Sequence, residues 1–215
     1  MLYRGFYGFG VWLGRVVVSA NALTYTSLAF AAAACVGAGA GAFALAALAV
    51  VAGGVCDALD GIVARSTGTV SRYGALLDST VDRVTDALPL LGVLVFYADA
   101  PTLAVVPGLA LLGAVVIPYV RARTEALGAS LPSLFMRRPE RLVLLIVCLL
   151  LGELESAAQI AVPLLLLGTL ILAVLNTFGG VLVLRAARVA LDASELDASE
   201  FERNRPSAPS TLRRP

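Results

Sequence analysis

The chain has 215 residues, of which 59% are hydrophobic and 14% are charged. Soluble domains average about 45–50% apolar and about 25% charged residues, so this composition argues against a water-soluble protein and for one embedded in lipid. All 16 basic residues are arginine, there is no histidine, and the formal net charge is +1. The sequence therefore excludes a histidine base, a histidine-ligated zinc ion and a lysine Schiff base.

Residues 1–20 combine glycines and aromatic side chains with two arginines, Arg4 and Arg15. This composition predicts an amphipathic juxtamembrane helix on the membrane surface, with the arginines at the headgroups and Trp12 near the interface. A cleaved signal peptide is the weaker alternative, because the apolar run that follows is long enough to form a full span.

Residues 21–190 consist of apolar stretches separated by short polar turns. A helix needs about 20 largely apolar residues to cross a bilayer. We therefore predict an all-α integral membrane protein with one domain of six transmembrane helices over residues 21–190. The expected spans are 21–38, 42–65, 74–98, 102–127, 139–153 and 156–189. Residues 191–215 are polar and then rich in proline and serine, so we expect a disordered cytoplasmic tail.

The arginines are distributed unevenly along these expected spans. With six spans, both termini and the loops after the second and fourth spans share one side of the membrane, and every arginine falls on that side or within a few helical turns of it. The opposite side carries Asp99, Glu153 and Glu155. The positive-inside rule then places both termini in the cytoplasm, and we expect a multi-pass protein of the cell membrane.

Four aspartates lie in the second and third expected spans, close to their cytoplasmic ends. A carboxylate inside a span costs roughly 2.5–3.5 kcal/mol on insertion scales, so four of them need compensation. Asp57 and Asp60 share one helix face by their i, i+3 spacing, and Asp78 and Asp82 share a face of the next helix by their i, i+4 spacing. Because the connecting loop is short, we expect the four carboxylates to converge just inside the cytoplasmic surface.

Converging carboxylates repel one another unless cations bridge them. Oxygen-only ligands favour hard cations, so these residues predict a site for Mg²⁺ or Mn²⁺, most simply a pair of ions. Two alternatives stay open from the residues alone: interhelical pairs with Arg65, Arg72 and Arg83, or the ion path of a cation transporter. Transporters usually hold such acids near the bilayer midplane, whereas these cluster at one end.

The segment from Asp57 to Asp82 resembles the CDP-alcohol phosphatidyltransferase family. The pattern of that family reads D-x2-D-G-x2-A-R-x8-G-x3-D-x3-D, and this chain matches every fixed position and every gap. The matching residues are Asp57, Asp60, Gly61, Ala64, Arg65, Gly74, Asp78 and Asp82. Eight fixed residues at fixed spacing are a specific signal, and the six-span layout extends the resemblance to about residues 1–190.

The resemblance implies an enzyme of phospholipid biosynthesis that transfers a phosphatidyl group from CDP-diacylglycerol to a small alcohol and releases CMP. By this resemblance, two divalent cations, Mg²⁺ or Mn²⁺, would be held by Asp57, Asp60, Asp78 and Asp82. The CDP-lipid pocket would be lined by Gly61, Ala64, Arg65 and Gly74. Asp82 would also accept the proton of the attacking hydroxyl. The resemblance further implies a homodimer with a cytoplasmic active site, and we expect no nucleic-acid partner.

Weaker similarities suggest the acceptor alcohol. The stretches 78–87, 119–128 and 137–145 are similar to the phosphatidylinositol-phosphate synthase branch, whose acceptor is inositol 1-phosphate. That branch holds the acceptor phosphate with basic residues, which correspond here to Arg121, Arg138, Arg141 and Arg185. Membrane topology and anionic lipids also favour arginines at these places, so glycerol 3-phosphate, serine and inositol stay alternative acceptors. We expect Asp86 to pair with an arginine or to order the site.

Overall fold

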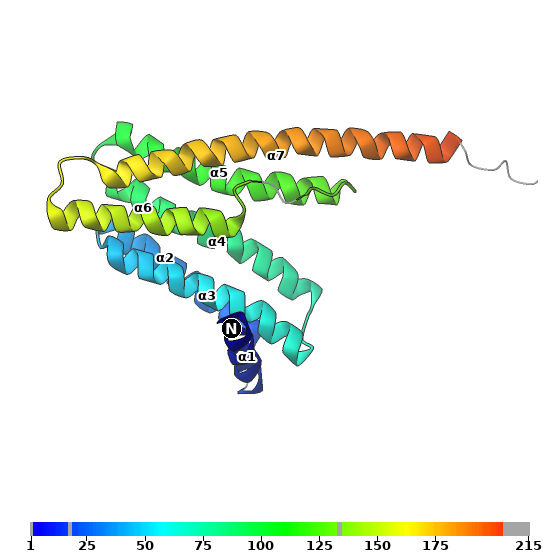
Figure 1. The fold of residues 1–215 in the computed structure, drawn as a ribbon, viewed down its shortest axis with the longest axis horizontal. Coiled ribbons are helices and arrows are strands. Elements are labelled where there is room, and N and C mark those ends of the chain that lie inside the picture. Colours follow the sequence, from blue (N-terminus) through cyan, green and yellow to red (C-terminus); the bar gives the residue numbers. More distant parts are fainter. Residues whose placement is uncertain (1, 17–18, 133–134, 204–215) are drawn as a thin grey trace, which may run out of the picture.

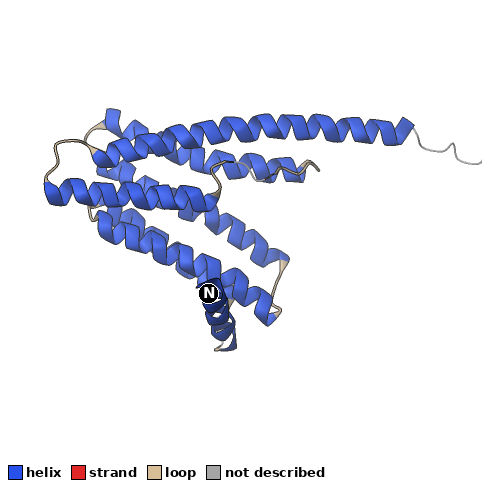
Figure 2. Ribbon diagram, viewed as in Figure 1, coloured by secondary structure: helices blue, strands red, loops and turns tan. Residues whose placement is uncertain are grey.

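The computed structural model describes residues 2–16, 19–132 and 135–203, and this part of the chain forms seven helices and no strand (Figures 1 and 2). The helices are α1 Leu2–Arg15, α2 Ala20–Gly39, α3 Phe43–Thr67, α4 Arg72–Phe96, α5 Pro101–Ala126, α6 Arg138–Ala158 and α7 Leu164–Arg203. The prediction of an all-α protein is therefore confirmed.

Among the described residues, four helices are long and apolar enough to cross a membrane: α2, α3, α5, and α7 over its part Leu164–Leu196. The helices α4 and α6 have 25 and 21 residues, but each carries several charged side chains in its first half. Both pack among the apolar helices, because α4 contacts α2 and α5 while α6 contacts α3 and α7 (Figure 1). The six helices expected from the apolar stretches are thus present, and four of them have the composition of a span.

The last two helices differ from the prediction. The helix α6 runs to Ala158 and α7 begins at Leu164, so the sixth apolar helix does not start at 156 as we expected. In addition, α7 continues to Arg203, through residues that we expected to belong to a disordered tail. Residues 191–203 contain alanine, leucine and glutamate and no glycine or proline, so nothing ends the helix where its apolar part ends. The remainder of the expected tail, 204–215, lies outside the described residues.

Two glutamates near the end of α6 accept hydrogen bonds from the first turns of two other helices. Glu153 Oε2 accepts a hydrogen bond from the Ala44 N–H of α3 at 3.0 Å, and Glu155 Oε2 accepts one from the Leu165 N–H of α7 at 2.9 Å. The first N–H groups of a helix have no partner within the helix, and a negative charge there also complements the helix dipole. One turn of α6 therefore anchors the beginnings of two other helices.

The first helix lies across the end of α3 that carries the aspartates (Figure 1). A Cβ atom at Gly10 would lie 2.7 Å from Ile62 Cγ2, and one at Gly14 would lie 2.9 Å from Thr67 Cγ2. These glycines, one turn apart, permit the close contact between the two helices. Trp12 is exposed.

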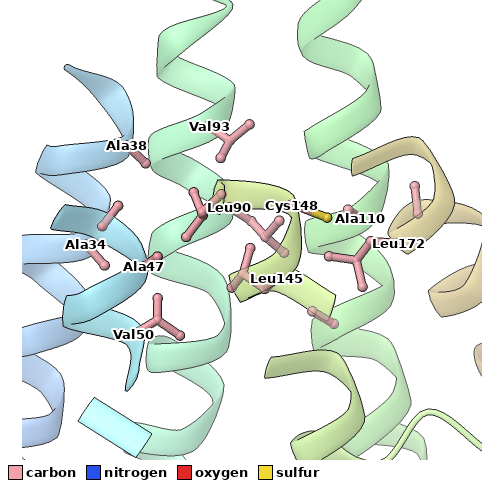
Figure 3. Packing of buried hydrophobic residues seen from close by; sticks show 14 of the residues in the cluster. Ala34, Ala38, Ala47, Val50, Leu90, Val93, Ala110, Leu145, Cys148 and Leu172 are labelled. Atoms are coloured by element: carbon pink, nitrogen blue, oxygen red, sulfur yellow. The ribbon is translucent and has the colours of Figure 1, made fainter. Parts of the chain in front are cut away.

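The core of the bundle combines alanines of α2, α3 and α5 with larger apolar side chains of α3 to α7 (Figure 3). Buried residues that line it include Ala34, Ala38, Ala47, Val50, Leu90, Val93, Ala110, Leu145, Cys148 and Leu172. The closest approach is between α2 and α4, where a Cβ atom at Gly92 would lie 2.3 Å from the carbonyl oxygen of Cys35. The absence of a side chain at Gly92 therefore permits α2 and α4 to pack closely.

Candidate active site

A short turn brings the end of α3 beside the beginning of α4. Gly68 has a φ of 69°, a conformation that favours glycine, and it ends α3. Ser71 begins α4, because its Oγ accepts a hydrogen bond from the Gly74 N–H at 2.9 Å. The two helices contact each other much less than each contacts α2. Their facing side chains are therefore only partly covered by one another.

Three of the four aspartates form a close cluster at this place. Carboxylate oxygens of Asp57, Asp60 and Asp78 lie within 4.8 Å of one another. Asp60 is 6% exposed and accepts a hydrogen bond from Thr24 Oγ1 of α2 at 2.6 Å. Asp57 Oδ1 is buried and has no hydrogen-bond partner within the part of the chain that the structure describes. A divalent cation would balance this negative charge and bind the unpartnered oxygen, so the residues fit the predicted metal site.

The fourth aspartate joins the cluster through an arginine. Arg138 Nη1 of α6 lies 2.5 Å from Asp57 Oδ2 and 3.0 Å from Asp82 Oδ1. The second contact is an ion pair that lacks hydrogen-bond geometry. Asp82 Oδ1 is therefore buried without a hydrogen-bond partner among the described residues. The prediction placed all four carboxylates in one group. In the structure, carboxylate oxygens of three of them lie within 4.8 Å of one another, and Asp82 shares the Arg138 guanidinium with Asp57.

Asp86, one turn after Asp82, pairs with two arginines. Its Oδ1 lies 3.2 Å from Arg138 Nε, and its Oδ2 lies 2.5 Å from Arg141 Nη2. Asp86 and Arg141 are 6% and 7% exposed, so this is a buried network. The expectation that Asp86 pairs with an arginine is confirmed. Within the network, Arg141 Nη1 also donates to the carbonyl oxygen of Met136 at 2.8 Å.

A first cavity, of about 280 Å³, opens beside the cluster and is lined by α2, α3, α4 and the turn between α3 and α4. Its walls include all four residues that the family resemblance assigned to the CDP-lipid, namely Gly61, Ala64, Arg65 and Gly74. Asp60 and Asp78 also form part of the wall. A Cβ atom at Gly61 would lie 3.0 Å from Arg65 Nη1, so the absent side chain leaves room for the guanidinium against the helix.

A second cavity, of about 260 Å³, lies beside Asp82 and is lined by α4 to α7 and the segment before α6. Asp82 and Asp86 contribute acids to its wall. Three of the four arginines predicted to hold an acceptor phosphate also line it, namely Arg121, Arg138 and Arg141. The aspartates thus face two cavities, with Asp60 and Asp78 on the first and Asp82 on the second.

The four arginines differ in what they contact. Arg121 donates from Nη2 to the carbonyl oxygen of Pro132 at 3.0 Å and from Nη1 to that of Leu131 at 3.3 Å, so it fixes the segment after α5. Arg185 is exposed on α7, apart from the three that line the second cavity. The structure therefore brings three of these arginines together and leaves Arg185 on the surface.

Several lining residues did not appear in the sequence prediction. Asn21, Thr24 and Ser71 belong to the first cavity, and Phe135 and Met136 to the second. Polar residues in the first turns of an apolar helix could have indicated Asn21 and Thr24. No local signal indicated Met136, whose φ of 62° is unusual for a residue other than glycine and depends on the surrounding structure.

A family model described as CDP-alcohol phosphatidyltransferase matches residues 17–178, a range that includes all four aspartates and both cavities' acidic residues. The chain belongs to the CDP-alcohol phosphatidyltransferase family. The resemblance inferred from the spacing of eight residues is therefore confirmed by a match over most of the chain.

Two curated relatives share part of the sequence. The chain is 38% identical to the phosphatidylinositol phosphate synthase of Mycolicibacterium smegmatis over 96 residues. These residues make up 43% of this chain and 43% of the relative. Over 147 residues it is 30% identical to the archaetidylinositol phosphate synthase of Pyrococcus horikoshii, with 68% of this chain and 77% of the relative covered. The chain thus matches less than half the length of the first relative and about three quarters of the second.

Solved structures share the fold over a larger part. The crystal structure of Mycobacterium tuberculosis phosphatidylinositol phosphate synthase with CDP-DAG bound is similar with a TM-score of 0.75 and 28% identity, covering 86% of this chain and 94% of that chain. The same protein in complex with manganese and citrate gives a TM-score of 0.75 and 28% identity, covering 85% and 88%. The arrangement of the helices is therefore shared across most of both chains.

Proposed function

We propose that this chain transfers a phosphatidyl group from CDP-diacylglycerol to inositol 1-phosphate and releases CMP. The observation that carries this proposal is the position of the aspartates between two cavities, one with the residues matched to the CDP-lipid and one lined by arginines. The names of the two relatives and the CDP-DAG bound to the solved neighbour support the choice of substrates.

The first cavity suits a nucleotide diphosphate attached to a lipid. Arg65 offers a guanidinium that binds phosphate with several fixed donors. Gly61 and Gly74 present backbone without a side chain, so a diphosphate can come close to both helices. Thr24 holds the Asp60 carboxylate in place by its hydrogen bond of 2.6 Å.

The aspartate cluster would hold the metal ions of the reaction. Two divalent cations, Mg²⁺ or Mn²⁺, would be bound by Asp57, Asp60, Asp78 and Asp82. Such ions neutralise the charge that develops on the diphosphate and on the leaving CMP. Manganese in the neighbouring structure supports this assignment. Because Arg138 contacts Asp57 and Asp82, its guanidinium and a cation compete for the same carboxylates.

The reaction forms one bond and breaks one. The acceptor hydroxyl oxygen attacks the phosphorus atom that carries the diacylglycerol, and the bond from this phosphorus to the CMP oxygen breaks, so CMP leaves with the electron pair. The Asp82 carboxylate accepts the hydroxyl proton. Its place in the wall of the second cavity, next to Asp57 across Arg138, supports this role.

The second cavity suits an acceptor that carries a phosphate. Arg121, Arg138 and Arg141 line it, and Arg185 would join them from α7. Fixed guanidinium groups favour a phosphorylated acceptor over serine or free inositol. Another acceptor, such as glycerol 3-phosphate, is the second candidate. A cation transporter is a weaker one, since the two cavities match two substrates.

We further propose six transmembrane helices, α2 to α7, with α1 on the membrane surface and both termini and the site in the cytoplasm. The packing of α4 and α6 among four apolar helices supports the span count, and the distribution of the arginines supports the orientation. A homodimer stays a proposal that rests on the family, and light scattering of the purified protein in detergent tests it.

Purified protein tests this function with CDP-diacylglycerol and Mg²⁺, when inositol 1-phosphate, glycerol 3-phosphate, serine and inositol are offered separately and released CMP is measured. We expect inositol 1-phosphate to give the highest rate and EDTA to abolish it. Faster release with another acceptor would correct the substrate. No release with any of them would refute phosphatidyl transfer and favour the transporter.

A further inference from the structure

Beneath the second cavity, two buried polar side chains each have one unpartnered atom. Arg141 of α6 is 7% exposed and Asn176 of α7 is 1% exposed. Arg141 Nε and Asn176 Oδ1 are both buried, and neither has a hydrogen-bond partner among the described residues. Buried polar atoms without a partner are costly, and the great majority in folded proteins are satisfied by protein or by ordered water.

The other polar atoms of both side chains have partners. Arg141 Nη1 donates to the Met136 carbonyl oxygen at 2.8 Å, and Nη2 donates to Asp86 Oδ2 at 2.5 Å. Asn176 Nδ2 donates to the Ala110 carbonyl oxygen of α5 at 2.9 Å. What is left over is one donor, the Arg141 Nε–H, and one acceptor, Asn176 Oδ1.

Both residues line the same small cavity, which has a volume of about 10 Å³. Its remaining walls are the Asp86 side chain and apolar residues of α4, α5, α6 and α7. A buried water needs roughly 10–15 Å³ of such volume and two to four polar partners. Here a guanidinium donor, an amide acceptor and the Asp86 carboxylate supply three.

We propose that a single internal water occupies this cavity, accepts a hydrogen bond from Arg141 Nε and donates one to Asn176 Oδ1. By this bridge Asn176 becomes a positioning residue for Arg141. The functional part of this inference rests on the proposed role of Arg141 in binding an acceptor phosphate.

The bridge would hold the guanidinium from three directions. Asp86 of α4 holds Nη2, Met136 of the segment before α6 holds Nη1, and the water joins Nε to Asn176, which is itself held by α5. Each terminal nitrogen of Arg141 keeps one further N–H. A guanidinium that is already immobile loses little freedom when it binds a phosphate in the second cavity, and this strengthens binding.

A purely structural role for Asn176 would need only its Nδ2, which ties α7 to α5 through Ala110. Two substitutions separate these roles. Asn176→Asp keeps an oxygen that can accept from the water and loses the Nδ2 donor. Asn176→Leu has similar volume and loses both groups. Thr169→Val is the matched control, since Thr169 lies on the same helix, is 1% exposed and bonds only to its own helix, at Leu165.

Steady-state kinetics with inositol 1-phosphate and CDP-diacylglycerol test the positioning role. For Asn176→Leu we expect the acceptor KM to rise about tenfold, the equivalent of one water-mediated contact, with the KM for CDP-diacylglycerol unchanged. Asn176→Asp should have an acceptor KM close to that of the unsubstituted protein, and Thr169→Val should have the same acceptor KM as the unsubstituted protein. An equal rise of the acceptor KM in Asn176→Asp and Asn176→Leu would overturn the positioning role of Asn176. An equal rise of the KM values for the acceptor and for CDP-diacylglycerol in Asn176→Leu would also overturn it.

A high-resolution experimental structure tests the water itself and does not depend on the reaction. We expect density for a water within about 3.2 Å of both Arg141 Nε and Asn176 Oδ1, and loss of this density in Asn176→Leu. A direct contact between the two side chains, or no density there, would overturn the proposal. If the protein does not turn over inositol 1-phosphate, the proposed function is refuted. The electron density then tests by itself whether the water is present.

Discussion

Asp82, like Asp57, contacts the Arg138 guanidinium, which lies 3.0 Å from its Oδ1. It also lines the second cavity, where the acceptor hydroxyl would lie. This position on the second cavity, which Asp57, Asp60 and Asp78 do not line, separates a proton-accepting role from a purely metal-binding one.

Asp82→Asn removes the proposed proton acceptor while keeping the size of the side chain. We expect kcat for CMP release to fall by at least about 100-fold, the usual contribution of a general base, while CDP-lipid binding is largely retained. Asp192→Asn, at an exposed aspartate of α7 that lies 3.8 Å from Arg188, is the matched control and should leave turnover unchanged. Undiminished turnover in Asp82→Asn would remove Asp82 from this role.

Arg138→Gln removes the guanidinium that contacts Asp57 and Asp82. We expect Mn²⁺ to bind roughly tenfold more tightly in the absence of substrates, because the ion no longer competes with a fixed positive charge. Electron paramagnetic resonance of free Mn²⁺ measures this affinity.

The control for Arg138→Gln is Arg137→Gln, at the neighbouring arginine, which is 61% exposed and pairs with Glu140. This change should leave the affinity as it is. Unchanged or weaker Mn²⁺ binding in Arg138→Gln would contradict the competition between the guanidinium and the ion.

At the scale of helices, the closest contact is the one between α2 and α4 at Gly92. A Cβ atom there would lie 2.3 Å from the Cys35 carbonyl oxygen, so Gly92→Ala forces the helices apart. We expect a loss of about 1–3 kcal/mol in the free energy of unfolding, seen as a lower Tm in detergent.

Gly108→Ala is the control for that substitution. A Cβ atom at Gly108 would lie 3.6 Å from Leu94 Cδ1, which is an ordinary contact, and alanine is the better helix former. Its Tm should equal or exceed that of the unsubstituted protein. Equal Tm values for Gly92→Ala and Gly108→Ala would show that the α2–α4 crossing is not tight.

The sequence predicted helices well where a repeating pattern exists, and less well where a helix depends on a distant partner. Spacing placed Asp57 with Asp60, and Asp78 with Asp82, on shared helix faces. The structure clusters Asp57, Asp60 and Asp78, and it places Asp82 in the wall of the second cavity. It did not reveal that Glu153 anchors the start of α3, because that bond joins residues far apart in the chain. Nor did it extend α7 beyond residue 190, since a polar composition was interpreted as disorder although no helix breaker is present.

The site shows the same division between local pattern and tertiary contact. The four residues matched to the CDP-lipid lie together because they belong to two helices, α3 and α4, that one short turn joins. The position of Arg138 between two aspartates depends on how α6 packs against α3, and no local pattern encodes it. For the same reason Arg185 resembled the other arginines in sequence but is exposed on α7.

At the scale of the whole molecule, the sorted arginines determine the expected orientation in the membrane. A fluorescent protein fused after residue 215 should be fluorescent, and alkaline phosphatase fused at the same place should be inactive, because both termini are expected in the cytoplasm. An active phosphatase fusion would reverse the orientation and would place the aspartates on the outer side.

By the proposed function, the aspartates catalyse a transfer between two substrates that the two cavities hold. Incubation with CDP-diacylglycerol, Mg²⁺ and isotopically labelled inositol 1-phosphate, followed by mass spectrometry of the lipids, tests it most directly. We predict one labelled phosphatidylinositol phosphate for each CMP released, and neither product with EDTA. Release of CMP without label in the lipid, or labelled lipid without CMP, would contradict the account.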